Sequence, residues 1–277
     1  MREKHKIVLL CKILKCSKSG YYQWIKNGRP NHKAYNAEIN NLVVSIYNED
    51  SRWGITSIRM QIHRKYNKRL SKKTIYRYMK INGIKSIIRK KRNKYGKKEH
   101  HNIPNLIKRD FVCSRPNQKW SIDISYIHTI QGVEYLCAIK DMYDKSIIEY
   151  QSSPRMSNFL VVETVEKAIK KVKLSKRENL ILHSDQGAQF TSTDYSKLLR
   201  ENHIRHSVSA KGNCADNVPI ESWFSALKSE CIYLIKKVPR ERIRELIRQY
   251  VDYYNNERLQ EQLKELTPME YRKLAHI

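Results

Sequence analysis

Three carboxylates have positions suited to metal-dependent chemistry on phosphodiesters. Asp123 lies on the polar side of an alternating segment, Asp185 directly follows a short apolar run, and Glu221 comes just after Pro219, where a helix is expected to begin. Displacement at phosphorus needs an activated oxygen nucleophile and a stabilised leaving oxygen, and two Mg²⁺ ions about 3.5–4 Å apart supply both. Carboxylates are suitable ligands because Mg²⁺ prefers hard oxygen atoms. The pattern alone leaves open that these acids are solvated or stabilise helix N-termini.

The expected helix over residues 219–234 carries a second feature of this chemistry. Its apolar stripe leaves Glu221 to one side, and Lys228 returns to nearly the same face two turns later. A lysine at that place is suited to hold a DNA phosphate beside the carboxylates. Lys211 in the preceding loop is a further candidate DNA contact, and Asp216-Asn217 is expected to cap the helix and so position the glutamate.

Other conspicuous residues have plainer interpretations. His183 is expected to be a structural histidine at a strand end, and His203 and His206 to flank or enter a strand without forming a metal pair. Trp120 and Trp223 are expected in the core. None of the six cysteines forms a CxxC pattern, which favours free thiols in a reducing compartment.

The second half of the chain has the pattern of a mixed α/β domain. Strands are expected over 119–129, 133–139, 146–150, 180–185 and 204–208, and helices over 160–172, 195–200, 219–234 and 241–254. Three strands in a meander followed by alternating helix and strand fit a mixed sheet with helices on its faces. The order matches the ribonuclease H-like arrangement by analogy, and the pattern alone permits other α/β folds.

The net charge of +28 is concentrated in the first part of the chain. Residues 1–110 hold 29 Lys and Arg against 6 Asp and Glu, whereas residues 111–277 hold 26 against 21. This asymmetry indicates a polyanion-binding module in front of a different kind of domain. The basic segments lack the wide apolar face of a membrane-surface helix, so nucleic acid is the better partner. No apolar run of about 18 residues is present, and a cytoplasmic, nucleoid-associated location is expected.

The basic half is expected to be helical and to bind DNA. Residues 1–30 have the pattern of a helix-turn-helix in which Ser17 caps the second helix. A second helical unit is expected over 31–88, with Thr56 and Ser71 as helix caps and Gly83 as a C-terminal left-handed residue. The candidate DNA contacts of its last helix are Lys72, Lys73 and Arg77.

A basic linker is expected between the two halves, over residues 89–114. Seven of the ten residues in 89–98 are Lys or Arg, a density that prevents packing and favours an extended segment along phosphates. Its candidate phosphate contacts are Lys90, Lys91 and Arg92. The remaining residues, 115–277, are expected to form the catalytic domain with C-terminal helices.

Four sequence motifs closely resemble those of insertion-sequence transposases in the retroviral integrase superfamily. They are PNQKWSIDISYI at 116–127, HSDQGAQFTS at 183–192, SAKGNCADN at 209–217 leading into IESWF at 220–224, and a tail with YNNER at 254–258 and TPMEYR at 267–272. Between Asp185 and Glu221 lie 35 residues, the spacing typical of the superfamily. The likeness covers nearly the whole chain, and the departures, Trp53 for tyrosine and Ala188 for serine, do not touch the three acids.

The resemblance implies a specific activity. It implies a ribonuclease H-like integrase core in which Asp123, Asp185 and Glu221 are the metal ligands and Lys228 contacts the end of the element. Members of this family use Mg²⁺, with Mn²⁺ tolerated, to nick terminal inverted repeats and join the freed 3′-hydroxyl to target DNA. The resemblance also implies a homo-oligomer on DNA and an upstream-frame partner protein, or a fusion with it, because this chain is similar to the second of two overlapping reading frames.

Two other functions fit parts of the pattern. One is a DNA-binding regulator with an inert catalytic half, which the three intact acids argue against. The other is a structure-specific nuclease on the same fold, which cuts DNA without joining it.

Overall fold

The structure is a computed structural model that describes residues 7–13, 16–27, 35–87, 103–173, 178–209 and 214–275. The chain divides into two compact units, Met1–Leu42 and Val43–Ile277. Four of the candidate DNA contacts, Lys90, Lys91, Arg92 and Lys211, lie outside the described residues.

The first unit contains the expected pair of short helices. These are α1 (Ile7–Ile13) and α2 (Lys18–Lys26). Ser17 caps α2 as expected, because its hydroxyl accepts a hydrogen bond from the backbone N–H of Gly20 at 3.2 Å. Cys11 is buried, whereas Tyr22 and Trp24 on α2 are exposed.

Three further helices make up the rest of the basic half. They are α3 (Ala37–Glu49), α4 (Ile55–Tyr66) and α5 (Lys72–Ile81). Their apolar faces share a buried core whose members include Val43, Ile46, Ile58, Ile62, Ile75 and Tyr78. This helical spacing of Ile and Val is the pattern from which the helices were expected.

Two of the three expected end signals of these helices are confirmed. The Ser71 hydroxyl accepts from the N–H of Thr74 at 3.0 Å, and Gly83 has a φ of +65°, which a residue without a side chain adopts at no steric cost. The assignment of Thr56 as a cap was wrong. The N-cap is Gly54, which has no side chain to accept a bond, and Thr56 lies inside the first turn of α4.

A five-stranded sheet organises the second half. Its strands are β1 (Lys119–Thr129), β2 (Gly132–Asp141), β3 (Ile147–Ser153), β4 (Ile181–Ser184) and β5 (Arg205–Val208), in the spatial order β3-β2-β1-β4-β5. β1 pairs antiparallel with β2 and parallel with β4. The expected meander of three strands followed by parallel additions is therefore confirmed, and it places β1 at the centre of the sheet.

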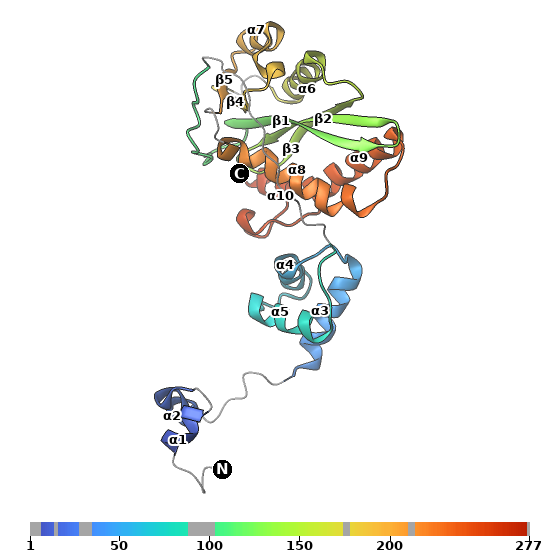
Figure 1. Cartoon of the computed structure of the whole chain (residues 1–277). Coiled ribbons are helices and arrows are strands. Elements are labelled where there is room, and N and C mark those ends of the chain that lie inside the picture. Colours follow the sequence, from blue (N-terminus) through green and yellow to red (C-terminus); the bar gives the residue numbers. More distant parts are fainter. Residues whose placement is uncertain are drawn as a thin grey trace. The chain divides into compact units, whose positions relative to one another are not determined.

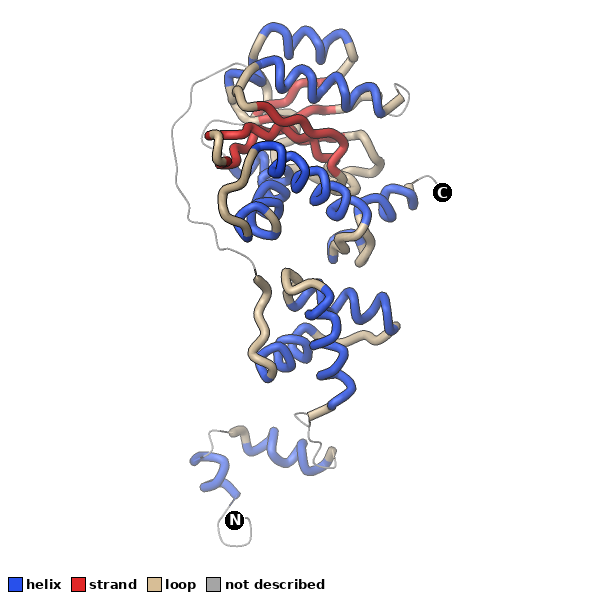
Figure 2. Tube along the Cα trace, turned by 90° about the vertical axis from the view of Figure 1, so that its right-hand side faces the viewer, coloured by secondary structure: helices blue, strands red, loops and turns tan. Residues whose placement is uncertain are grey.

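Helices cover both faces of this sheet (Figures 1 and 2). On one face, α6 (Asn158–Lys171) and α7 (Thr193–Glu201) enclose the first core, which includes Trp120, Ile122, Val161, Val165, Leu182 and Tyr195. On the other face, α8 (Val218–Glu230) and α9 (Arg240–Asn256) enclose the second core, which includes Ile127, Leu136, Ala138, Ile220, Trp223 and Tyr254. Trp120 and Trp223 thus lie in the core, as expected. The alternation of β1 directs neighbouring residues to opposite cores.

The helix that carries Glu221 is shorter than its sequence pattern indicated. It ends at Glu230, and a short 3₁₀ turn (η4, Ile232–Leu234) follows. The Glu230 carboxylate is held from the other side by Arg258, at 2.7 and 3.0 Å, and by the hydroxyl of Tyr250 at 2.8 Å. These long-range contacts, which the local pattern does not contain, coincide with the end of the helix.

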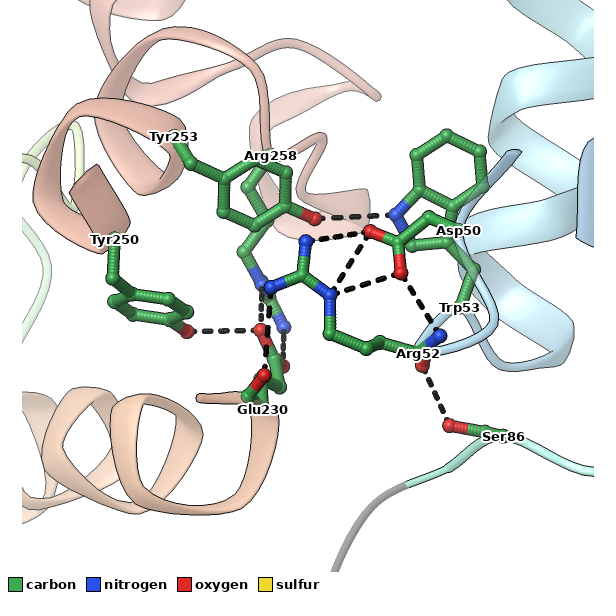
Figure 3. A network of polar contacts seen from close by, with 8 residues as sticks. All are labelled: Asp50, Arg52, Trp53, Ser86, Glu230, Tyr250, Tyr253 and Arg258. Carbon is green, nitrogen blue, oxygen red and sulfur yellow. Dashed lines mark hydrogen bonds and ion pairs between the residues drawn. The ribbon is translucent and has the colours of Figure 1, made fainter. Parts of the chain in front are cut away.

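Residues 50–53 contact this same end of α8 and the neighbouring α9 (Figure 3). The Arg52 guanidinium makes a bidentate pair with Asp50 and lies 4.8 Å from the centre of the Tyr253 ring. The Trp53 indole N–H donates to the Tyr253 hydroxyl at 3.1 Å. Trp53 therefore contributes a contact between the α3–α4 connection and the sheet domain.

The last described element is a short helix that was not among the expected helices. This helix, α10 (Pro268–Leu274), begins with a capping box between Thr267 and Glu270. Its Arg272 reaches two buried acids at the end of β2: its Nη1 lies 2.9 Å from Asp144 and 3.5 Å from Asp141. The tail motif thus anchors the C-terminal segment to the sheet.

Candidate active site

Asp123 lies on the face of β1 that α8 and α9 cover. Its partner across the strand pair is Ala138, a member of the second core. The Asp123 side chain is half-buried, and its Oδ1 accepts from the N–H of Ile124 at 2.8 Å. The alternation predicted from the sequence therefore holds, with Ile122 and Ile124 directed to the first core.

Asp185 directly follows β4, the parallel neighbour of β1. Ser121 pairs with His183, and continuing this parallel register by two residues sets Asp185 level with Asp123 on β1. Its Oδ1 accepts from the N–H of Gly187 at 2.8 Å. A Cβ atom at Gly187 would lie 2.8 Å from that same oxygen, so only glycine permits this turn without displacing the carboxylate.

Glu221 is exposed in the first turn of α8, and the start of this helix is bonded to both central strands. The Asn217 side-chain amide donates to the carbonyl of Ile122 at 3.5 Å. The Lys140 ammonium group donates to the carbonyl of Pro219 at 2.9 Å. These two bonds hold the first turn of α8 next to the part of β1 that carries Asp123.

Asp216 and Asn217 were expected to cap α8 with their side chains, and this expectation was wrong. Asn217 occupies the N-cap position but makes no side-chain cap bond. Asp216 is buried and accepts instead from Asn105 at 3.0 Å and from Arg109 at 3.1 Å. Asp216 therefore ties the segment around residues 103–110 to the turn before α8, a contact for which the sequence contained no local signal.

The three acids are carried by neighbouring elements: the central strand β1, the turn after its parallel neighbour β4, and the start of α8. Within the part of the chain that the structure describes, no group of three or more His, Cys, Asp or Glu side chains is placed to hold a metal ion. The chemistry of the donor set, three carboxylates without a thiolate, nevertheless fits a hard divalent cation such as Mg²⁺.

Lys140 is an ionisable residue whose side chain is buried beside the second core. It is 4% exposed, and its Nζ lies 5.7 Å from the centre of the Tyr254 ring. Burial and the neighbouring Arg258, opposed by Asp144, together lower the pKa of Lys140 to about 7. This lysine was not among the residues selected from the sequence, because nothing in its local pattern distinguishes it from a solvated lysine on a strand.

This lowered pKa predicts a pH dependence of stability. Between about pH 7 and pH 10 the lysine is protonated in the unfolded chain and largely neutral in the folded one, so the free energy of unfolding rises with pH. Lys140→Met lacks this contribution. We expect the variant to exceed the parent in stability most at or below pH 7, with the difference shrinking towards pH 10. Urea titrations across this range measure it, and a difference independent of pH would contradict the assignment.

His183, two residues before Asp185, bonds serine side chains on the neighbouring strand and directly after it. His183 is buried, with Nδ1 2.8 Å from the hydroxyl of Ser207 and Nε2 3.2 Å from that of Ser209. Burial lowers the pKa of His183 and of His206 to about 4 each, so both are neutral at physiological pH. His183 therefore joins β4 to the end of β5, in agreement with its expected structural role.

The described candidate DNA contacts differ in their surroundings. The Lys228 ammonium lies 4.9 Å from the centre of the exposed Tyr126 ring, at the end of β1. Lys72 makes an ion pair with Glu261 at 2.8 Å, and both side chains are about half exposed. The Arg77 guanidinium lies 5.5 Å from the centre of the Tyr78 ring, and Lys73 is exposed.

Membrane insertion finds no support in the described helices. None of them is both long and apolar enough to cross a bilayer.

Profiles of known families match three parts of the chain. The family described as "Integrase core domain" matches residues 114–214, a second family of the same description matches residues 221–275, and one described as "HTH-like domain" matches residues 34–92.

Curated relatives and solved structures agree with these matches. The chain is 34% identical to the Escherichia coli K12 protein named "Putative transposase InsK for insertion sequence element IS150", over 87% of this chain and 85% of the relative. It is 30% identical to transposase InsF of insertion sequence IS3A from the same organism, over 90% and 89% of the two chains. A chain of the simian T-cell lymphotropic virus intasome, solved with PP2A regulatory subunit B56 gamma, is 13% identical with a TM-score of 0.50, over 83% of this chain and 74% of that one.

The last similarity concerns the fold alone, and it agrees with the helix-covered mixed sheet found here. The curated relatives match this chain over most of its length. By its sequence, its integrase core and its HTH-like segment, the chain belongs to the family of insertion-sequence transposases.

Proposed function

We propose that this chain cleaves DNA at the ends of an insertion sequence and joins those ends to target DNA, with Asp123, Asp185 and Glu221 as its metal ligands. The observation that carries the proposal is the placement of the three carboxylates on neighbouring elements of the sheet domain: on the central strand β1, directly after β4, and in the first turn of α8. Family membership gives the substrate class, because the relatives are named as transposases of insertion sequences.

The side chains have distinct tasks in this proposal. Asp123 and Asp185 are held against backbone N–H groups through their Oδ1 atoms, which fixes their orientation before DNA binds. Glu221 is exposed in the first turn of α8, and we propose that it completes the set of metal ligands with the other two acids. When bound, Mg²⁺, or Mn²⁺ in its place, would stabilise charge on the attacking and leaving oxygens of the phosphodiester.

The basic residues are proposed to hold DNA around these acids. Lys228 lies on the Glu221 helix and would contact a phosphate of the element's end. Lys73 and Arg77 on α5 would contact the duplex further away, and Lys72 would exchange its carboxylate partner Glu261 for a phosphate. The remaining candidates outside the described residues, Lys90, Lys91, Arg92 and Lys211, complete the proposed phosphate contacts.

DNA binding should depend strongly on salt. If the basic half, residues 1–110, neutralises about six to ten phosphates, the affinity for DNA should fall about 10³–10⁵-fold between 50 and 200 mM salt, because condensed counterions are released on binding. Fluorescence anisotropy with a labelled duplex measures this slope. An affinity that hardly changes with salt would contradict the assignment of this half to phosphate binding.

A strand-transfer assay tests the activity itself. We expect the full chain, with Mg²⁺ and an oligonucleotide carrying the terminal inverted repeat, to join the 3′-end to target DNA, and Glu221→Gln to lose this joining. Glu241→Gln is the matched control, because Glu241 is an exposed acid in the first turn of the neighbouring helix α9.

The outcomes separate three functions. Equal joining by Glu221→Gln and the parent would remove the acid from the chemistry. Binding of the repeat without any cutting by the parent would favour a DNA-binding regulator. Cutting without joining would favour a structure-specific nuclease.

The proposal also includes assembly and organisation. The chain would act as a homo-oligomer that holds both element ends, together with, or fused to, the product of an upstream reading frame. The proposed domains are a helix-turn-helix over 1–30, a second helical DNA-binding unit over 31–88, a basic linker over 89–114 and the catalytic domain over 115–277. Its proposed place of action is the bacterial nucleoid.

A further inference from the structure

Lys140 combines three unusual features. Its side chain is almost completely buried, and the only hydrogen bond described for its ammonium group goes to the carbonyl of Pro219. The ladder between β2 and β3 shifts register between Ile139 and Lys140, an irregularity of the kind that re-aims side chains next to functional sites. Its backbone pairs with Ser121, two residues before Asp123 on the central strand.

This arrangement is expensive for the folded protein. A buried ammonium group loses its hydration, and a single neutral acceptor replaces only part of it. The ammonium also lies at the start of α8, where the helix dipole is positive and favours anions. Two unfavourable contributions at one position indicate that Lys140 does not serve stability, and residues of this kind are concentrated at functional sites.

The bonds around Lys140 form a short path between two of the proposed ligands. On one side, its backbone belongs to the β1–β2 ladder that contains Asp123. On the other side, its side chain holds Pro219, from which only Ile220 separates Glu221. Ile220 is itself fully buried in the second core, so the turn cannot shift without disturbing packed side chains.

We propose that Lys140 is a positioning residue for strand cleavage and joining: its bond to Pro219 fixes the first turn of α8, and with it Glu221, relative to Asp123. This inference rests on the proposed function, because it assigns to Lys140 the alignment of two of the proposed ligands. Asn217, which bonds the carbonyl of Ile122, supports the same turn from β1.

Lys140→Met tests the inference, because it keeps most of the side-chain volume and removes the ammonium group. We expect a fall in the joining rate on the order of 10²-fold, as for a displacement of about 1 Å at a catalytic group, with unchanged KM for DNA and an unfolding midpoint equal to or above that of the parent. Loss of activity together with retained or higher stability is the result that a merely structural lysine would not give.

Lys119→Met is the matched control. Lys119 is the second buried lysine of the sheet and is 8% exposed. Its ammonium group donates three hydrogen bonds, to the backbone carbonyls of Asp110 and Val112 and to the Asp110 carboxylate. It lies on β1 but touches neither α8 nor the acids in any described bond. We expect this variant to lose stability and to retain its joining rate under conditions where it is folded.

Hydrogen exchange gives a readout that does not depend on activity. In Lys140→Met, amide exchange should accelerate in a peptide covering residues 218–224 and stay unchanged in peptides from α9. In Lys119→Met, the peptide 218–224 should exchange as in the parent.

The results separate this inference from the proposed function. If Glu221→Gln is inactive while Lys140→Met joins DNA at the parent rate with parent-like exchange at 218–224, the role of Lys140 is overturned and the proposed function stands. If Glu221→Gln joins DNA like the parent, the proposed function fails, and accelerated exchange in Lys140→Met would then show only that the lysine holds the turn.

Discussion

Asp185→Asn should lower the rate of strand transfer by about 10³-fold or more. Loss of one anionic ligand weakens the charge stabilisation that a metal provides in the transition state, which is worth several kcal/mol, and about 1.4 kcal/mol corresponds to tenfold in rate. The asparagine keeps an oxygen at the position of Oδ1, so it can still accept from the N–H of Gly187, and the turn after β4 should remain. Stability should therefore change little.

The affinity for DNA separates a chemical from a structural effect. Removing a negative charge near the phosphates should leave the affinity of Asp185→Asn for the element's end unchanged or slightly higher. Asp194→Asn is the matched control, because Asp194 is an exposed aspartate nine residues further along, in the first turn of α7. Comparable rates for both variants would exclude Asp185 as a metal ligand.

Arg272→Met should destabilise the protein by about 3–5 kcal/mol, the usual effect of leaving buried charge without its partner. The Arg272 guanidinium bonds Asp144 at 2.9 Å, Ser146 at 3.1 Å and Asn117 at 2.7 Å, and Asp141 lies 3.5 Å away. Both acids are fully buried. Methionine would remove the ion-pair partner that the two acids share among the described residues.

The size of this loss should depend on pH. Burial and the adjacent Asp144 raise the pKa of Asp141 to about 7, against the lowering effect of Arg272. At pH 5 Asp141 is therefore largely protonated in the folded state, and removing Arg272 should cost less than at pH 8. Urea unfolding at the two values measures the difference.

Arg248→Met controls for the loss of any arginine. Arg248 pairs with Glu245 three residues before it, on the exposed face of α9. Such a surface pair contributes little, so a change within about 0.5 kcal/mol is expected. A similar loss for both arginine variants would contradict the structural role of Arg272.

Much of the fold could be predicted because its signals are local. The alternation over 119–129 indicated β1 with its observed bounds, because each side of a central strand contacts a different core. Ser17 and Ser71 were identifiable as caps because a cap bonds within its own first turn. The start of α4 was predicted less accurately, because two nearby residues, Gly54 and Thr56, both suit an N-cap position. The helix begins directly after Gly54.

Contacts between distant segments set the limits of prediction. The sequence pattern continued the Glu221 helix to residue 234, whereas it ends at Glu230, where Arg258 and Tyr250 approach from another part of the chain. Asp216 was expected to cap a helix, but Arg109, more than a hundred residues earlier, takes its carboxylate. Arg272 was recognised as part of a tail motif, and its acidic partners were not.

The members of the candidate site were predicted from the sequence alone. Asp123, Asp185 and Glu221 were identified by their motifs and spacing, because the chemistry of a ligand depends on residue type and the strand or helix around it on local pattern. Only the tertiary structure decided how they are held: the parallel register that brings Asp185 level with Asp123, and the buried Lys140 that bonds the turn before Glu221. The physical reason is that burial and hydrogen-bond partners are properties of the packed chain, so a lysine that looks solvated in sequence becomes a buried contact only when two strands and a helix come together.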